Sequence, residues 1–304
     1  MLEIRNLIKV YPGPVAALRG ISLSIPHGMF GLLGPNGSGK TTLMRILTGL
    51  LEPTSGTVRF GEVDVVARPE LLWPRLGHLP QAFGFYPNLS GEAMLVHMLR
   101  LKGVAAPGGV RRLAGELLAR VNLSAAAARP VKSYSGGMRQ RLGIAQAIAG
   151  DPDLLIVDEP TAGLDPEERV RFYRLLAELA ERRTILLSTH IVEDVAMLCP
   201  NFAVIRNGRL LVRTTPATAR AELAGTMYEG EVGRDELDGF SARYRVTQAH
   251  LVEGRNRVRV HLPAGEPPPG FVAAVPTLED AYLLWTKQDA EEQEETARGI
   301  VSTG

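Results

Sequence analysis

Apolar residues in the first two thirds of the chain follow two spacings, one typical of buried strands and the other of amphipathic helices. Continuous apolar runs at 29–33, 154–157 and 185–187 are bounded by polar residues, as in strands buried on both faces of a parallel sheet. Helical spacing appears at Leu43, Ile46, Leu47 and Leu50, and again at Leu142, Ile144, Ala145 and Ile148. Strands that alternate with helices predict an α/β fold.

Other segments add to this core. Residues 15–25 and 56–65 are typical of strands in an antiparallel layer, whereas the pattern from 83 to 131 is helical and predicts a helical subdomain. Two strands around 203–206 and 209–212 are separated by Asn207-Gly208, the dipeptide of a type I′ hairpin turn. We therefore expect a first domain that spans residues 1–216.

A second, smaller domain of the α+β class is expected over 217–288. Alternating segments at 244–251 and 258–262 predict strands, and Pro267-Pro268-Pro269-Gly270 breaks the chain after them. Thr277 followed three residues later by Asp280 predicts a capped helix whose apolar face holds Leu278 and Trp285. Residues 289–304, rich in Glu and small polar types, are expected to form a disordered tail.

Composition narrows the class of protein. The 304 residues include 34 basic and 33 acidic ones, so no charge excess points to nucleic acid. One cysteine, Cys199, cannot form an internal disulfide, which fits a reducing compartment. No run reaches about 18 apolar residues and no internal repeat is present. We expect a chain that does not span a membrane by itself and that carries one nucleotide site.

The most informative motif is the glycine-rich segment that lies between the first apolar strand and its helix. Its residues that can face phosphate are Gly34, Asn36, Gly37, Ser38, Gly39, Lys40, Thr41 and Thr42. Glycines let several backbone N–H groups converge on an anion, and the helix that begins near Thr41 adds the positive end of its dipole. Lys40 is expected to reach the β- and γ-phosphates and Thr41 to ligate Mg²⁺. The alternative is a glycine-rich turn with a surface lysine.

Two further elements carry candidate chemistry. Ser135-Gly136-Gly137 precedes a helix and offers a hydroxyl, close backbone approach and a helix N-terminus, although an ordinary helix cap has the same residues. Asp158 and Glu159 end a buried strand, where open α/β sheets place their ligands. Asp158 is suited to hold Mg²⁺ through water and Glu159 to activate the attacking water, whereas a solvated strand end is the alternative.

In order and spacing these three elements resemble the ATP-binding subunits of ABC transporters over residues 1 to about 216. The resemblance implies a P-loop nucleoside triphosphatase core, ATP and Mg²⁺ as cofactors, and a head-to-tail dimer. In that dimer Ser135, Gly136 and Gly137 of one chain close on the γ-phosphate held by the other. One residue, Tyr134, departs from the family pattern, which commonly has leucine at this position.

Four more positions take roles from the same resemblance. Tyr11 is similar to the aromatic residue that stacks on adenine, and Gln81 to the glutamine that touches Mg²⁺ and the attacking water. Asp165 resembles the aspartate that crosses the dimer interface, and His190 the switch histidine at the γ-phosphate. The alternatives are a packed strand aromatic for Tyr11, a surface amide for Gln81, a helix cap for Asp165 and a structural histidine for His190.

The resemblance implies an ATPase subunit that works as a homodimer, or with a homologous subunit, on the cytoplasmic face of the membrane. Transmembrane permease subunits are the expected partners, and Phe83, Phe85 and Tyr86 are candidates for the contact surface. The stretch from Pro276 to Leu283 is similar to the end of drug-export and ABC-2-type subunits, which favours export. The other function considered is a soluble ABC-type ATPase acting on nucleic acid or ribosomes; no nucleic-acid partner is expected.

Overall fold

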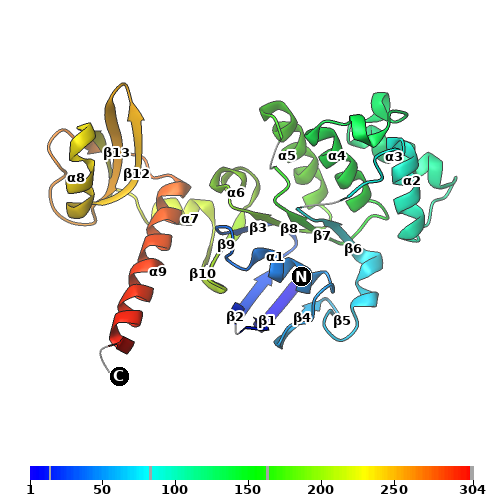
Figure 1. Cartoon of the computed structure of the whole chain (residues 1–304), viewed down its shortest axis with the longest axis horizontal. Coiled ribbons are helices and arrows are strands. Elements are labelled where there is room, and N and C mark those ends of the chain that lie inside the picture. Colours follow the sequence, from blue (N-terminus) through cyan, green and yellow to red (C-terminus); the bar gives the residue numbers. More distant parts are fainter. Residues whose placement is uncertain (14, 82–83, 162–163, 302–304) are drawn as a thin grey trace. The chain divides into compact units, whose positions relative to one another are not determined.

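The computed structural model describes residues 1–13, 15–81, 84–161 and 164–301, with side chains to residue 291 (Figure 1). It divides into two compact units. The first comprises Met1–Ile191 and Leu198–Leu210, and the second Val192–Met197 and Leu211–Gly304. The division lies a few residues before the boundary expected at 216, and the grouping of 192–197 with the second unit was not expected from the sequence.

The first unit is built on a six-stranded sheet of the order β10-β9-β3-β8-β7-β6. Its strands are β3 (Gly28–Leu33), β6 (Leu76–Leu79), β7 (Leu154–Asp158), β8 (Thr184–Thr189), β9 (Asn201–Arg206) and β10 (Arg209–Thr214), whose residues 211–214 are already grouped with the second unit. The pairs β3–β8, β3–β9, β6–β7 and β7–β8 are parallel. Because β3, β7 and β8 are almost wholly buried, the continuous apolar runs of the sequence identified them correctly.

A second, antiparallel sheet has the order β2-β1-β4-β5, with β1 (Leu2–Tyr11), β2 (Val15–Ile25), β4 (Ser55–Phe60) and β5 (Val63–Asp64). Helix α1 (Lys40–Leu47) contributes apolar side chains to a core that residues of both sheets share. Figure 1 shows α1 between the two sheets. The expected helical face was too long by one residue: Leu50 is exposed, because Gly49 adopts a left-handed backbone (φ 72°) just after the helix.

The remaining helices of the first unit are α2 (Gly91–Leu101), α3 (Val110–Arg120), α4 (Gly136–Ala147) and α5 (Pro166–Ala180). Short 3₁₀ turns lie at Pro69–Leu71, Trp73–Arg75, Ser124–Ala126 and Val131–Ser133. Helix α5 packs on β3 and β8, and α4 on β6 (Figure 1). Within α2, Met94, Leu95 and Leu99 are buried and belong to the core. Tyr86, which precedes α2, is exposed. Phe83 lies outside the described residues.

The second unit has the α+β composition that was predicted. It contains α6 (Val192–Leu198), α7 (Pro216–Ala221), β11 (Met227–Val232), a 3₁₀ turn (Arg234–Glu236), α8 (Leu237–Arg243), β12 (Arg245–Val252), β13 (Arg255–His261), β14 (Val272–Ala273) and α9 (Leu278–Val301). The antiparallel sheet has the order β12-β13-β11-β14. The tail prediction was wrong as far as Val301, where α9 ends, because Glu, Gln and Ala are good helix formers that extend a capped helix.

A buried carboxylate anchors the start of α9. Asp280 accepts hydrogen bonds from Thr247 Oγ1 (2.8 Å), Arg259 Nη2 (2.8 Å) and the Thr277 backbone N–H (2.9 Å). In return, the backbone N–H of Asp280 donates to Thr277 Oγ1 (3.1 Å), which completes the capping box predicted from the sequence. The stretch from Pro276 to Leu283 therefore ties α9 to the sheet of its own unit.

Replacement of the Asp280 carboxylate should lower the stability of the second unit against unfolding. Asp280→Ala removes the bonds to Thr247, Thr277 and Arg259 and leaves Arg259, which is 14% exposed, with Glu229 as its carboxylate partner, so we expect a loss of about 2–4 kcal/mol in the free energy of unfolding. The chain has one tryptophan in each unit, Trp73 and Trp285. Urea unfolding followed by Trp285 fluorescence in a Trp73→Phe background measures the effect. Asp238→Ala, an exposed acid of α8, is the control and should cost about 1 kcal/mol or less.

The same site gives a pH dependence with a defined sign. Burial by itself raises the pKa of Asp280, but hydrogen bonds from Arg259 and Thr277 outweigh it and hold the pKa below its ordinary value. A carboxyl whose pKa is lower in the folded state adds stability above its unfolded pKa and loses it as the pH falls through the folded pKa. In a plot of the free energy of unfolding against pH, the parent should therefore lose stability on the acid side, and Asp280→Ala should make this decrease shallower. An equally steep decrease in the variant would contradict the assignment.

Candidate functional site

The phosphate loop, residues 34–42, connects the end of β3 to α1. Helix α1 begins at Lys40, and Gly39 precedes it with φ 105° and no side-chain cap, so the first N–H groups of the helix face the loop. A Cβ at Gly39 would lie 2.6 Å from the Ala17 carbonyl oxygen, and one at Gly34 would lie 2.2 Å from that of Ile205. Glycine is required at both positions, because neighbouring backbone occupies the space of a side chain.

Lys40 lies across this loop. Its Nζ donates to the carbonyl oxygens of Gly34 (2.7 Å) and Pro35 (3.1 Å) and lies 3.4 Å from Glu159 Oε1. Lys40 and Glu159 are both buried, whereas His190, whose Nδ1 lies 2.5 Å from Glu159 Oε2, is half exposed. A cation, a carboxylate and an imidazole from three separate segments thus meet at one point.

The backbone of Glu159 is strained. Its φ is 50°, in the left-handed region that non-glycine residues rarely adopt, and its N–H donates to the Ser188 carbonyl oxygen (2.9 Å). Strain of this kind costs about 1–3 kcal/mol and is concentrated at functional sites. The turn directs the carboxylate back toward the phosphate loop instead of along the strand.

Asp158 lies at the very end of β7 and is almost fully buried. Its Oδ2 is 3.5 Å from Thr41 Oγ1, and burial raises the pKa of its carboxyl, with the neighbouring charge of Glu159 adding to the rise. Asp158 Oδ1 and Ser38 Oγ are both buried, and neither atom has a hydrogen-bond partner among the described residues. Unsatisfied oxygen atoms beside a hydroxyl and a carboxylate fit a hard cation that carries phosphate ligands.

Two polar residues in β8 support the site, although the sequence pattern did not identify them as site residues. Ser188 and Thr189 are fully buried at the end of an apolar strand, which is itself the signal that could have identified them. Their carbonyl oxygens accept the N–H groups of Glu159 and Gly34 (3.2 Å for the latter). The end of β8 therefore fixes the start of the phosphate loop and Glu159 relative to each other.

A second missed contact comes from the hairpin turn. Asn207 and Gly208 have φ values of 49° and 74°, as a type I′ turn requires. The Gly208 N–H donates to the carbonyl oxygen of Ser38 (3.0 Å) in the phosphate loop. A turn predicted only as the end of the domain thus supports the candidate site.

Two outlying candidates lie beside this centre. Tyr11 is half-buried, with its hydroxyl 3.4 Å from Thr42 Oγ1, so it faces the start of α1 and is not packed in the core. Lys9 Nζ lies 5.4 Å from its ring centroid. Gln81 is exposed just beyond β6, the neighbour of β7 in the sheet, and in the described part of the chain no hydrogen bond joins it to Asp158 or Glu159.

The signature segment (Ser135, Gly136 and Gly137) forms the N-terminus of α4. Ser135 Oγ accepts from the Met138 N–H (3.1 Å), and Gly136 is exposed. Tyr134, the departure from the family pattern, is buried and donates its hydroxyl to the Ala126 carbonyl oxygen (2.8 Å), so its role in the fold is packing.

Asp165 caps α5, because its Oδ1 accepts from the Glu168 N–H (2.8 Å). Ala162 and Gly163, which precede it in the same motif, lie outside the described residues. Among the residues that the structure describes, no hydrogen bond or ion pair joins the signature segment or Asp165 to the phosphate loop. One chain assembles the phosphate loop with Asp158, Glu159 and His190, but not the whole predicted site.

A phosphate loop after β3 of a parallel sheet, with an acidic pair at the end of β7, one strand removed across β8, defines the class of P-loop nucleoside triphosphatases. A sequence profile described as "ABC transporter" matches residues 18–162. The chain is 33% identical over 302 residues to Nod factor export ATP-binding protein I of Burkholderia orbicola, covering 96% of this chain and 98% of that protein. It belongs to the ABC transporter family, as an ATP-binding subunit with ATPase activity.

Other relatives agree. The chain is 38% identical over 228 residues to the daunorubicin/doxorubicin resistance ATP-binding protein DrrA of Streptomyces peucetius, covering 74% of this chain and 68% of that one. A match at 35% identity to ABC transporter A family member 7 of Arabidopsis thaliana covers 73% of this chain but only 24% of that protein. A solved dimer of an ATP-binding cassette with ADP and Pi has a TM-score of 0.65 at 25% identity, over 71% of this chain and 98% of the other.

From residue 1 to 301, apart from the short gaps at 14, 82–83 and 162–163, no helix is both long and apolar enough to cross a membrane.

Proposed function

We propose that this chain is the ATPase of an export-type ABC transporter, acting as a dimer at the cytoplasmic face of a membrane through separate transmembrane subunits. The observation that carries the proposal is the end-to-end similarity to a protein named for Nod factor export, which extends through the second unit. DrrA, named for drug resistance, supports the same group.

Mg²⁺ would be held by Thr41 and, through water, by Asp158, with Gln81 approaching from the end of β6. Bound Mg²⁺ neutralises charge on the phosphates and on the transferring phosphoryl group. The unsatisfied Asp158 Oδ1 and the short reach from Thr41 to Asp158 support this assignment. Gln81 must move or rotate to take part, since it is exposed in the described structure.

The remaining groups are assigned to the hydrolysis of ATP. Glu159 orients and deprotonates the attacking water, and His190, hydrogen-bonded to the same carboxylate, holds it and senses the γ-phosphate. Lys40, together with the loop amides of Gly37, Gly39 and Thr42, stabilises charge on the phosphates. Lys40 Nζ contacts Glu159 and the loop carbonyls, which holds the cation at the phosphate loop.

Adenine would stack on Tyr11. The signature segment and Asp165 are assigned to the nucleotide held by the opposite subunit. Their position away from the phosphate loop of their own chain supports action in trans, and the similar cassette is itself described as a dimer with ADP and Pi. A homodimer, or a pair with a homologous subunit, supplies both halves of each site.

The membrane association can be tested directly. A tagged chain expressed in its host should be recovered in the membrane fraction, and mild detergent should release it together with a multi-span membrane protein. ATPase activity should follow that complex and should disappear on removal of Mg²⁺ with a chelator. Recovery of all the chain in the soluble fraction, with no membrane protein attached, would rule out the transport assignment.

A further inference from the structure

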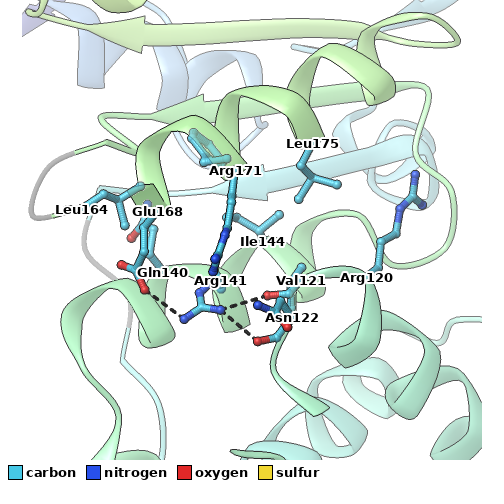
Figure 2. A pocket seen from close by; sticks show the side chains of 11 residues that line it. Arg120, Val121, Asn122, Gln140, Arg141, Ile144, Leu164, Glu168, Arg171 and Leu175 are labelled. Carbon is cyan, nitrogen blue, oxygen red and sulfur yellow. Dashed lines mark hydrogen bonds and ion pairs between the residues drawn. The ribbon is translucent and has the colours of Figure 1, made fainter. Parts of the chain in front are cut away.

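A single ion pair joins three helices beside the signature segment. Arg141 of α4 donates from Nη2 to Glu168 Oε1 of α5 (2.9 Å), and both side chains are mostly buried, with 18% and 16% exposed. Arg141 Nη1 donates to the carbonyl oxygens of Val121 (3.4 Å) and Asn122 (2.9 Å), at the end of α3. Figure 2 shows the guanidinium lying between these carbonyls and the carboxylate. A guanidinium can hold all of them at once because its donors diverge in one plane.

Glu168 also touches the signature segment. A Cβ placed on Gly137 would lie 1.6 Å from Glu168 Oε2, so the carboxylate occupies the space that a side chain at Gly137 would need. The backbone N–H of Glu168 is the donor to Asp165 Oδ1. One residue therefore contacts both elements that the proposed function assigns to the opposite nucleotide.

The surroundings make this pair a firm link. It lines a pocket whose other walls include Ile144, Leu164 and Phe172, with Leu164 immediately before Asp165 (Figure 2). Charge pairs beside apolar walls are screened less by solvent than exposed ones. The adjacent Glu167 gives the contrast, because its pair with Arg171 is largely exposed, at 77% and 52%, and touches neither element.

We propose that Arg141 and Glu168 are positioning residues that hold the signature segment and Asp165 in one fixed arrangement, so that both meet the nucleotide of the opposite subunit together. The proposal rests on the proposed function, since it concerns the trans half of that site. Without the pair, each segment must be ordered separately when the dimer forms. Couplings of this kind change an equilibrium by roughly 2- to 30-fold, and we expect about 10-fold here.

The experiment measures two equilibria in a Glu159→Gln background, in which hydrolysis is suppressed. Sedimentation gives the dimer dissociation constant at saturating MgATP, and fluorescent ATP titration at low protein concentration gives the affinity of the monomer. Glu168→Gln should raise the dimer dissociation constant about 10-fold and leave the monomer's affinity unchanged. Glu167→Gln, the matched control on the same turn of α5, should change neither. Thermal unfolding of each variant shows the folded fraction.

Two further variants separate positioning from plain stability. Arg141→Gln combined with Glu168→Gln should weaken the dimer no more than either substitution alone, because both remove the same link. Arg141→Lys keeps the charge but loses the planar guanidinium, so its dimer dissociation constant should lie between those of the parent and of Glu168→Gln. If Glu168→Gln lowered the melting temperature while leaving the dimer constant unchanged, the positioning role would be wrong. If the Glu159→Gln parent itself stayed monomeric with MgATP, the proposed function would fail first, and the positioning role with it.

Discussion

Glu159→Gln is expected to lower ATP turnover by about 10²- to 10⁴-fold while leaving a stable ATP-bound dimer. The amide keeps the size of the carboxylate and can still occupy the buried site between Lys40 and His190. It cannot accept a proton from water, so the nucleotide remains uncleaved between the subunits. Phosphate release measures the turnover, and gel filtration with light scattering measures the mass in the presence of MgATP.

A control for this substitution is available on the surface of the same unit. Glu62→Gln changes an acid that is fully exposed and whose nearest cation, Arg59, is 3.9 Å away, so it should leave both turnover and mass unchanged. Hydrolysis at the parental rate in Glu159→Gln would show that another group activates the water. A variant that is inactive but monomeric with MgATP would instead contradict the shared site.

The sequence alone predicted the first unit well, for identifiable reasons. Its central strands are buried on both faces, so they appear as unbroken apolar runs. The glycines at 34 and 39 are required because a neighbouring backbone oxygen occupies the place of a side chain at each position. The same regularity places Asp158 and Glu159 at the end of β7. Local pattern was sufficient here because each element carries its own signal.

Contacts between distant segments were not predictable in the same way. The bonds from Gly208 to Ser38 and from Arg141 to the end of α3 join residues that no local spacing relates. Similarly, the left-handed backbone of Glu159 follows from its bond to Ser188, not from any preference of glutamate. The length of α9 was misjudged for another reason, because polar composition alone does not separate a charged helix from a disordered tail.

The proposed dimer assigns the signature segment and Asp165 to the nucleotide of the opposite subunit. Ser135 and Asp165 are helix caps in the described structure, which is the ordinary alternative for each. A residue that caps a helix can still present its outer lone pair and the adjacent N–H groups to a second subunit. The cap and the trans role are therefore compatible in Ser135 and in Asp165.

Lys40→Met is expected to weaken nucleotide binding strongly and to lower turnover with it. Lys40 is buried, and the variant removes the only cation within ion-pair distance of Glu159 in the described chain apart from His190. Loss of one charge-assisted contact in a buried site costs about 2–5 kcal/mol, which corresponds to roughly a 30- to 4,000-fold weaker affinity. Methionine keeps the length of the side chain, so the fold of the loop should survive.

Ligand-dependent stability measures this effect without relying on catalysis. A bound nucleotide raises the free energy of unfolding by RT ln(1 + [ATP]/Kd), so, at an ATP concentration about ten times the parent's Kd, the melting temperature of the parent should rise and that of Lys40→Met should rise much less. Lys287→Met, in which a lysine of α9 that donates to the Val246 carbonyl oxygen is replaced, should keep the full ATP-dependent shift. Should Lys40→Met retain that shift, the internal bonds of Lys40 to the loop carbonyls would be its whole function, and another group would have to hold the phosphates.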